Sequence, residues 1–454
     1  MGQVPFFEKS FGQPGVDIAF AVKQNPDSNL YVFGYSDNSL TQSVDFALSK
    51  LSPAGDLYWT KYYGTADIDF GLSLSLADSF DLILAGVIET TGPLGQEVLL
   101  IKVDSAGQEL WRNTYGGPGN QSCKSVLKTS DGGYILCGYR SDPFGSNDSY
   151  VLKVDANGTF QWDSAYGGTD NEYAARIIEV PGPAFVMASD TRSAGSGGYD
   201  VMLNKLDSGG TELWNQVYGD AFQNGCQGVM RSTSDVLVTW GETEIFTNSP
   251  FDFFLYMFKQ SGDFIRQSVF GGAGADALFD LVETPGGDFM ATGYSNSQSS
   301  GTQPINLVLL RMDSLGTLQW SREYGDSSID IGYSIIPALG GGYYVAGRIT
   351  QADEEFYLLH VDENGLTGVQ EPFEGIHYPM EIWPNPAAQV CQVRLGFFAE
   401  VWEIYDATGR LLFRESGPAT TAKQLDISCF NKGFYRLRAY SEKQTASGKL
   451  MILR

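Results

Sequence analysis

The sequence has very little histidine, an excess of acidic over basic residues, and no long hydrophobic run. Only His360 and His377 occur in 454 residues, which argues against a histidine-rich metal site and against a histidine-based catalytic triad. Lys and Arg number 29 against 54 Asp and Glu, a net charge of −25, which argues against nucleic acid or an anionic membrane as partner. No apolar run approaches the roughly 18 residues that span a bilayer, so no membrane insertion is expected.

Cysteine is also scarce, and its spacing matches no zinc or redox motif. Cys391 and Cys429 are the plausible disulfide pair, and two buried free thiols are the alternative. Cys123 and Cys226 fall at one position of the repeats described next, where the other repeats carry mostly small residues. We therefore interpret these two as small apolar fillers.

The sequence is rich in aromatic residues, and their spacing reveals an internal repeat. An aromatic residue followed by glycine recurs seven times, at intervals of 51 to 54 residues. Five residues before this glycine stands Trp in five repeats, and 22 residues after it stands Gly in six repeats and Ser189 in the other. The seven steps are Phe11-Gly12, Tyr63-Gly64, Tyr115-Gly116, Tyr166-Gly167, Tyr218-Gly219, Phe270-Gly271 and Tyr324-Gly325.

Each repeat has the pattern of four short strands separated by turns. In the third repeat the expected strands are Cys123–Thr129, Tyr134–Tyr139, Ser149–Val154 and Phe160–Tyr166. Four antiparallel strands repeated at about this length are typical of a β-propeller, in which each blade buries its faces against its neighbours.

The ends of the repeat array predict the number of blades. Residues Pro5–Phe11 match a fourth strand, and the last repeat supplies three strands, Gly332–Leu339, Tyr343–Arg348 and Phe356–Val361. Joining the two closes the ring at seven blades and pairs an edge that would otherwise invite aggregation. The predicted fold class is all-β, with a seven-bladed β-propeller over residues 1–366, a linker over 367–379 and a small Ig-like β-sandwich over 380–454.

The last 75 residues resemble the type A sorting domain of the type IX secretion system of Bacteroidota. The resemblance rests on Trp383-Pro384-Asn385-Pro386-Ala387, on Ile404–Leu411, on Leu425–Ser428 followed by Lys432–Tyr435, and on Gly448–Leu453. It implies that residues 380–454 engage the type IX secretion machinery, that the protein reaches the outer cell surface or the extracellular space, and that the domain is then removed. Met1–Phe7 lacks the apolar stretch of a signal peptide, so we expect a signal that this sequence does not include.

The repeats resemble bacterial secreted propellers and, more distantly, the tryptophan-docked blades of pyrroloquinoline-quinone proteins. Asp104–Trp111 and Asp207–Trp214 are similar to that docking segment. The similarity covers the blade corner and includes no cofactor site, and a shared fold does not define a function. No cofactor is predicted, and a structural calcium ion is left open. The Trp series is interpreted as packing between blades.

The candidate ligand site lies on the face that carries the variable loops between the second and third strands. Five residues after each repeat-opening glycine stands a polar residue, which either binds a cation or polyol or bonds to the backbone of its own turn, and the sevenfold recurrence favours the second interpretation. Arg140 and Arg348 lie in or beside the loops of the same face. The seven recurring residues are Asp17, Asp69, Gln121, Glu172, Asn224, Asp276 and Asp330.

We therefore predict a secreted or cell-surface propeller, expected to be monomeric, that binds an extracellular glycan or a surface protein without catalysis. The alternative is an enzyme, such as a polysaccharide-degrading enzyme or a quinoprotein, that uses acids at the channel mouth. For that alternative the candidate is Glu172 beside Asp170, with Arg140 or Arg348 nearby. A third hypothesis is a structural component of a surface layer.

The negative charge belongs to the repeats alone. Residues 1–370 hold 45 acidic and 19 basic residues, a net charge of −26, whereas residues 371–454 hold 9 acidic and 10 basic residues. We therefore expect an acidic, soluble ring followed by a nearly neutral sorting domain.

Overall fold

The computed structural model is all-β and divides into two compact units, Met1–Gly368 and Val369–Arg454. No helix among the described residues is long and apolar enough to cross a membrane. The structure describes the whole chain except residues 1–5, 39–42, 66, 90–94, 118, 142–144, 220, 245–249, 273, 298–304, 326–327, 351–352, 368–375, 379, 384–388, 407–410, 431–432, 442–443 and 453–454.

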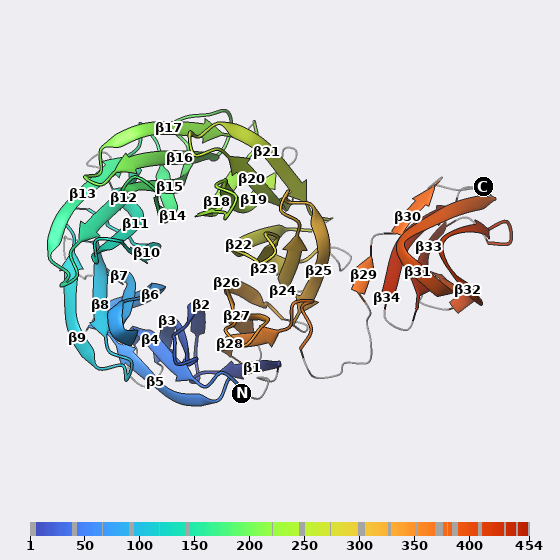
Figure 1. The fold of residues 1–454 in the computed structure, drawn as a ribbon, viewed down its shortest axis with the longest axis horizontal. Coiled ribbons are helices and arrows are strands. Elements are labelled where there is room, and N and C mark those ends of the chain that lie inside the picture. The colour runs from blue at the N-terminus through green and yellow to red at the C-terminus, as the bar shows by residue number, and fades with distance from the viewer. Residues whose placement is uncertain are drawn as a thin grey trace. The chain divides into compact units, whose positions relative to one another are not determined.

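The first unit is a β-propeller built from four-stranded antiparallel sheets, which Figure 1 shows arranged around a common axis. The chain enters each of the first six sheets at its innermost strand and leaves at its outermost strand. Sheet 1 contains β2 (Asp17–Gln24), β3 (Leu30–Asn38), β4 (Ser43–Leu51) and β5 (Leu57–Tyr63). Sheet 2 contains β6 (Ile68–Leu76), β7 (Leu82–Glu89), β8 (Gln96–Val103) and β9 (Glu109–Tyr115), with the 3₁₀ turn η1 (Asp78–Phe80) between β6 and β7. Sheet 3 contains β10 (Ser125–Lys128), β11 (Tyr134–Ser141), β12 (Asn147–Val154) and β13 (Phe160–Tyr166).

The remaining sheets of this unit repeat the same order, except that the last takes its outermost strand from the start of the chain. Sheet 4 contains β14 (Glu172–Val180), β15 (Ala184–Thr191), β16 (Asp200–Asp207) and β17 (Glu212–Tyr218). Sheet 5 contains β18 (Asn224–Arg231), β19 (Leu237–Glu244), β20 (Phe251–Phe258) and β21 (Phe264–Phe270). Sheet 6 contains β22 (Asp276–Glu283), β23 (Phe289–Ser295), β24 (Asn306–Met312) and β25 (Leu318–Tyr324). Sheet 7 contains β26 (Ile331–Pro337), β27 (Tyr343–Thr350), β28 (Glu354–Val361) and β1 (Phe7–Phe11).

The strands of the third repeat agree with the predicted ranges except at the loop side. The fourth strand has the predicted bounds, Phe160–Tyr166. The second and third strands extend to Ser141 and back to Asn147, so the loop expected over residues 140–147 is shorter than predicted. The first strand is also shorter than expected and begins at Ser125, after an isolated bridge between Gln121 and Arg140.

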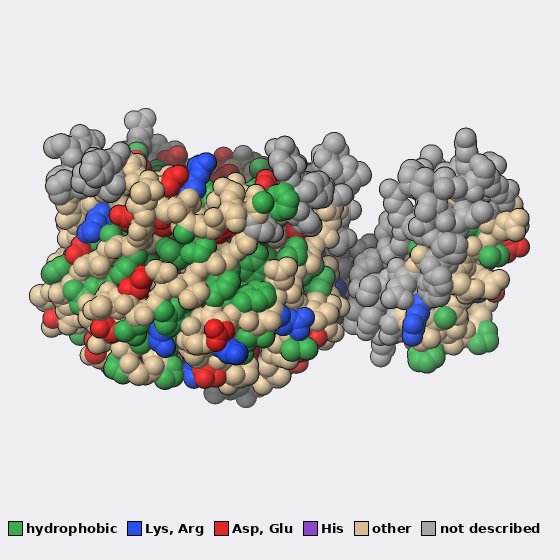
Figure 2. Space-filling view, turned by 90° about the horizontal axis from the view of Figure 1, so that it is seen from above, with side chains coloured by type: hydrophobic (Ala, Val, Ile, Leu, Met, Phe, Trp, Pro, Cys, Tyr) green, Lys and Arg blue, Asp and Glu red, His purple; other side chains and the backbone are tan. Residues whose placement is uncertain are grey.

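The cores of this unit lie between neighbouring sheets. In β3, Tyr31, Val32 and Phe33 are all fully buried, because both faces of an inner strand are covered by another sheet. One cluster joins Phe33 and Phe46 of sheet 1 to Leu84 of sheet 2, and similar clusters fill the spaces between other adjacent sheets. The outermost strands alternate between exposed and half-buried residues, and Figure 2 shows apolar and charged side chains interspersed on the outer wall.

The recurring Trp and Tyr side chains connect five of the sheets to the next one, as the sequence predicted for the Trp series. The ring of Trp59 lies against Gly107, in the turn between β8 and β9 of sheet 2. Tyr63 donates a hydrogen bond of 2.8 Å to the carbonyl of Gly107, which has a φ of 71° and leaves no room for a side chain. Tyr166 repeats the contact with the carbonyl of Gly210.

The second unit is a single six-stranded sheet with two long, bent strands. It contains β29 (Ile376–Tyr378), β30 (Met380–Trp383), β31 (Val390–Asp406), β32 (Leu411–Asp426), β33 (Gly433–Tyr440) and β34 (Gln444–Ile452). The pairing of β31 with β32 shifts register at Ala399, so two parts of each strand pair in different registers around a core that includes Trp402, Ile404 and Leu437.

Three expectations for the tail differ from the structure. The runs Gln392–Leu395 and Val401–Tyr405 belong to one strand, β31, because the bulges bend the strand without ending it. The segment expected as a linker contains β29, which pairs with β34 in parallel, so the unit is not wholly antiparallel. The sequence left a disulfide and two buried free thiols open for Cys391 and Cys429; both are free thiols, and the buried alternative holds for Cys391 only, since Cys429 is exposed.

Candidate functional site

The seven polar residues predicted as a ligand ring are buried at the start of each innermost strand. Each is at most 2% exposed. Five of the side chains accept a hydrogen bond from the turn that precedes them: Asp17 accepts from the backbone N–H of Gln13 at 2.6 Å, and Asp69 accepts from that of Thr65 at 2.6 Å. Gln121, Glu172 and Asp276 accept in the same way from Gly117, Gly168 and Gly272, Asn224 accepts from Thr243 and Tyr256, and Asp330 accepts from Thr350.

This arrangement is the turn-capping interpretation of the recurring residues. Burial raises the pKa of Asp17, Asp69 and Asp276, and hydrogen bonds from the turns oppose that rise. Their contacts organise the crossing from one sheet to the next, and a ligand role for the ring stays a prediction.

The acid pair suggested for an enzyme forms no ion pair with the arginines expected beside it. Glu172 accepts hydrogen bonds from Thr191 and from backbone groups, whereas the cation paired with Asp170 is Arg192 at 3.9 Å. Arg140 pairs with Asp163 at 3.1 Å and lies over the ring of Tyr150. Arg348 pairs with Glu354 at 2.9 Å. Neither Arg140 nor Arg348 is therefore an ion-pair partner of Asp170 or Glu172.

A β-bulge recurs in the innermost strands, three residues beyond the buried ring. In six sheets the pairing of the first and second strands skips one residue at this position, which leaves that residue unpaired and redirects its side chain. In sheet 3 the same position is Lys124, just before β10. The six bulged residues are Phe20, Leu72, Ala175, Gln227, Phe279 and Tyr333.

On sheets 6, 7 and 1 the bulged residues are aromatic, and their rings pack together. The ring centroids of Phe20 and Tyr333 lie 4.7 Å apart, and those of Tyr333 and Phe279 lie 5.0 Å apart. Tyr35 and Tyr294, from the second strands of sheets 1 and 6, extend the row at 5.9 Å from Phe20 and Phe279 respectively. We call these five residues the aromatic arc. All five side chains are half-buried, so part of each ring remains accessible.

On sheets 3 and 5 the corresponding residues are polar. Lys124 donates a hydrogen bond of 2.9 Å from Nζ to Oε1 of Gln227, a residue 103 positions away in sequence. The amide of Gln227 donates to the carboxylate of Glu242 at 3.3 Å, and Asp190 accepts from the backbone N–H of Cys226 at 2.5 Å. Ala175 is the bulged residue of the intervening sheet, and its small side chain suits the approach of Lys124 to Gln227. We call Lys124, Asp190, Gln227 and Glu242 the axial cluster.

The two carboxyl groups of the axial cluster are electrostatically unusual. Burial raises the pKa of Asp190 to about 7. Burial and the charge of Asp190 together raise the pKa of Glu242 to about 7, and the cation of Lys124 opposes the rise at both groups. Carboxyl groups with such a pKa can hold or release a proton near neutral pH, which makes them functional candidates.

A second set of charges crosses the axis one residue further along the strands. Arg176 of β14 and Asp280 of β22 form an ion pair of 2.9 Å between sheets 4 and 6, and Arg176 lies over the indole ring of Trp240. Asp280 also accepts from the backbone N–H of Ile335. Burial lowers the pKa of Lys23, which feels the charges of both ion-pair partners. These contacts join strands of sheets 4, 6 and 7 beneath the axial cluster.

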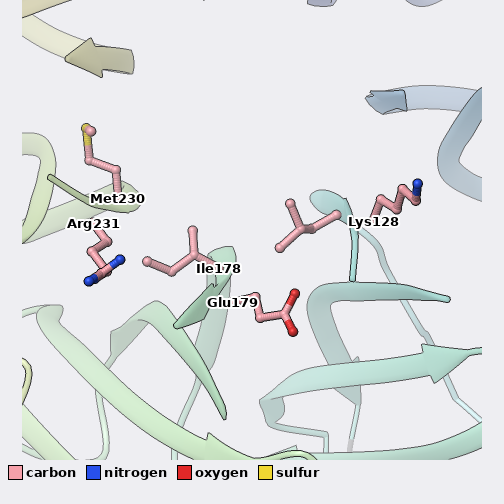
Figure 3. Close-up of a pocket in the computed structure, with 6 residues that line it drawn as sticks. Lys128, Ile178, Glu179, Met230 and Arg231 are labelled. Carbon is pink, nitrogen blue, oxygen red and sulfur yellow. The ribbon is translucent and has the colours of Figure 1, made fainter. Parts of the chain in front are cut away.

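A pocket of about 450 Å³ lies at the far ends of β10, β14 and β18 (Figure 3). Its apolar part is formed by Leu127, Ile178 and Met230, and its charged part by Lys128, Glu179 and Arg231. Each of these charged groups already has a partner: Lys128 pairs with Asp78, Glu179 accepts from Ser130, and Arg231 pairs with Asp235. The pocket therefore offers mainly an apolar surface to a ligand.

Within the described residues, no group of three or more His, Cys, Asp or Glu side chains is placed to hold a metal ion. The two cysteines of the inner strands, Cys123 and Cys226, are fully buried, and burial raises the pKa of both thiols. They fill space beside the axis, as the sequence predicted.

Sequence reasoning missed the axial cluster, although a signal for it exists. The residue directly after the recurring Gly or Ser of the second strand is Tyr, Val or Arg in five repeats, but Asp190 and Glu242 in the fourth and fifth. Three residues after the buried polar ring, the third and fifth repeats carry Lys124 and Gln227, where three others carry an aromatic residue. Comparing each repeat position separately would have shown this local change from aromatic to polar.

Comparisons with known proteins show likeness in the propeller and a family in the tail. A curated relative, Regulatory protein FlaEY of Caulobacter vibrioides, is 26% identical over 168 residues, which cover 31% of this chain and only 18% of that protein. The solved structure of PorZ, described as an essential bacterial surface component of the type-IX secretion system of Porphyromonas gingivalis, is 13% identical, with a TM-score of 0.46 over 98% of this chain and 60% of that chain.

The WD40 domain of Pan2 from Neurospora crassa is 12% identical, with a TM-score of 0.49 over 80% of this chain and 96% of that chain. These structural likenesses concern the fold. The tail is defined more closely, because residues 381–453 match the family model of the secretion system C-terminal sorting domain. The motif residues 384–387, 407–410 and 432 lie outside the described residues. Residues 381–453 are thus a secretion system C-terminal sorting domain, which indicates export of the propeller to the cell surface or the extracellular space.

Proposed function

We propose that the protein is a seven-bladed propeller, closed by its N-terminal strand, that is exported through its sorting domain and binds an extracellular glycan or protein. Two observations support closure. β1 pairs with β28 over five residues, from Phe7 with His360 to Phe11 with Phe356. The ring of Phe7 lies against Gly55 of sheet 1, as Trp59 lies against Gly107 of sheet 2, and one apolar cluster joins sheets 7 and 1.

Deleting residues 1–11 tests closure directly. The deletion exposes the edge of β28 and removes the contact with sheet 1, so the propeller should unfold at lower temperature and self-associate. Scanning calorimetry and light scattering measure both effects. A truncated chain that stays monomeric and unfolds at the wild-type temperature would contradict closure by β1.

The binding role rests on a single observation, the axial cluster. The repeats of a propeller pack through similar residues at equivalent positions. Packing therefore does not require polar side chains that face one another on three consecutive sheets. Lys124 is exposed and its three partners are half-buried, so a ligand can reach them. The described loop between β15 and β16, residues 192–199, lies at the end of sheet 4 where Glu172 starts β14, and it can add further contacts.

Substitutions at the axial cluster test this role. Lys124→Met and Glu242→Gln keep the approximate size of each side chain, and Glu363→Gln, at an exposed turn, is the matched control for a lost charge. A panel of glycans and purified surface proteins is first screened with the wild-type protein. We expect each axial variant to weaken binding of the selected ligand by about tenfold or more, equivalent to about 1.4 kcal/mol. Wild-type affinity in both axial variants would refute a binding role for the cluster.

A second candidate is an enzyme that uses the same two carboxyl groups, and their pKa values near 7 favour it. One group would donate a proton and the other would accept one, as in glycoside hydrolysis. Reducing-sugar release from polysaccharides between pH 5 and 8 is the assay. Activity lost in both Asp190→Asn and Glu242→Gln would support an enzyme, and full activity in either variant would exclude this mechanism.

A further inference from the structure

We propose that the axial cluster and the aromatic arc together form a binding site for an uncharged saccharide. This inference rests on the proposed binding function and narrows it from any extracellular ligand to a neutral sugar ring. Three properties of the site carry it: the aromatic rings, the set of hydrogen-bonding groups, and the balance of charge.

The aromatic arc supplies the surface that a sugar ring requires. A pyranose has one face of C–H groups that packs against aromatic rings, and half-buried rings keep an accessible part for that contact. Phe20, Tyr333 and Phe279 form a continuous row with centroid separations of 4.7 and 5.0 Å. Tyr294 connects this row to the polar side. Burial is the largest cause of the raised pKa of its hydroxyl, and the negative charge of Glu242 is the next, so the two side chains lie near enough to interact.

The axial cluster supplies donors and acceptors on the neighbouring sheets. Lys124 offers an ammonium group, Gln227 an amide with both a donor and an acceptor, and Asp190 and Glu242 offer carboxyl oxygens. The bonds within the cluster are few, since Glu242 is bonded by Gln227 at 3.3 and 3.4 Å and Asp190 by one backbone N–H. Lone pairs and protons therefore remain for ligand hydroxyl groups, which both donate and accept.

The balance of charge selects against ionic ligands. The charged side chains of the axial cluster and of the ion pairs near it are the acids Asp190, Glu242, Asp280 and Glu354 and the bases Lys124, Arg176, Lys23 and Arg348. Asp280 and Glu354 neutralise Arg176 and Arg348, and at neutral pH the two axial carboxyl groups, each with a pKa of about 7, together carry about one negative charge against the cation of Lys124. The propeller around it carries a net charge of −26, which repels uronates and sulfated sugars. A hydroxylated, uncharged ligand with an apolar face fits what remains.

The experiment compares ligand classes and variants with the full chain. Neutral cello-, manno- and malto-oligosaccharides, polygalacturonate, chitosan oligomers and a lysine-rich peptide are tested by calorimetry at 50 and 300 mM NaCl. A neutral oligosaccharide should bind with an affinity that changes less than about twofold with salt, because no net charge is neutralised. Salt-sensitive binding of only the charged ligands would overturn the saccharide inference. If that binding were still weakened by Lys124→Met, the proposed function would survive.

Two substitutions at Tyr294 separate the contribution of its hydroxyl group from that of its aromatic ring. Tyr294→Phe keeps the ring and loses only the hydroxyl, whereas Tyr294→Leu removes the aromatic face. We expect saccharide affinity to fall by about threefold in the first and by about tenfold or more in the second. Phe160→Leu, on the exposed outer strand β13, is the matched aromatic control and should bind as wild type. Equal affinity of Tyr294→Leu and Phe160→Leu would refute the aromatic arc as part of the site, and saccharide binding that no axial variant alters would refute the proposed function as well.

Discussion

Replacing Asp190 with asparagine should stabilise the propeller above pH 7 while weakening its ligand binding. Burial raises the pKa of the Asp190 carboxyl group from an ordinary value of 3.8 to about 7. The folded state therefore binds this proton more tightly than the unfolded state does. Between pH 3.8 and pH 7 the contribution of Asp190 to stability falls as pH rises, and it reaches its lowest value once the folded group is ionised. Asparagine has nearly the same shape and never ionises, so the variant escapes that loss.

The size of the effect follows from the shift in pKa. A difference of about three pH units corresponds to about 4 kcal/mol, at 1.36 kcal/mol per unit. This is an upper bound, because the Asp190 side chain is half-buried and solvent screens part of the cost. We expect Asp190→Asn to gain about 1–2 kcal/mol in free energy of unfolding at pH 8 relative to its value at pH 5. Glu242→Gln should behave alike, and the double variant should gain less than the sum, because the charge of Asp190 raises the pKa of Glu242.

Urea unfolding at pH 5, 6, 7 and 8, followed by tryptophan fluorescence, measures the difference between wild type and each variant. Taking the difference cancels the contributions of all other titrating groups, and Glu363→Gln controls for the loss of one negative charge at an exposed site. The advantage of Asp190→Asn should grow with pH and level off near pH 8. An advantage that is constant with pH, or largest at pH 5, would refute the assignment of a raised pKa. A gain in stability together with lost binding is the usual signature of a functional group.

Three further predictions concern the scaffold. Tyr63→Phe removes the hydrogen bond to Gly107 between sheets 1 and 2 and should cost about 1 kcal/mol in urea unfolding, and an unchanged midpoint would show that the bond adds nothing. Asp131→Asn should cost about 2 kcal/mol at pH 7, because it removes the carboxylate paired at 2.9 Å with Lys153, which is 2% exposed. Burial raises the pKa of Asp131, but hydrogen bonds from Thr129 and Lys153 outweigh it and lower the pKa to about 2. The cost should therefore vanish as pH falls from 3.8 through about 2, and a cost that persists at pH 2 would contradict this. Thiol titration of the native chain should show rapid reaction at Cys429 only and all five thiols after unfolding. Three thiols in the chain unfolded without reductant would instead show a disulfide, which removes two.

Much of the scaffold was predictable because its determinants are local and repeated. The Tyr-Gly step and the Trp five residues before the glycine recur because each sheet docks on the next through the same contact, seen at Trp59, Tyr63 and Gly107. The turn-capping interpretation was also accessible from sequence, since a polar side chain four residues after the N–H that it binds is a local feature. The sorting domain was identifiable from four motifs in order, and a family model matches residues 381–453.

The remaining features depend on contacts between distant residues. The bulge that redirects Gln227 is a property of strand pairing, so nothing in the sequence of β18 alone indicates it. Its bond to Lys124 joins residues 103 positions apart, and the small side chain of Ala175 on the sheet between them suits that bond. The structure was also needed to show that Cys391 and Cys429 are not bonded to each other. Their spacing in the sequence cannot show that one thiol points into the core and the other into solvent.

The sequence by itself determined the repeating β-architecture, the acidic character of the propeller and the sorting role of the tail, because these depend on composition and on short motifs. Only the tertiary structure decided where the candidate site lies. It turned the seven recurring polar residues inward, where five of them cap their own turns, and it gathered four non-recurring residues from three sheets at the axis. The physical reason is the radial arrangement of the sheets, which brings the same position of every innermost strand to one place, so that a departure in a single repeat becomes part of a shared surface.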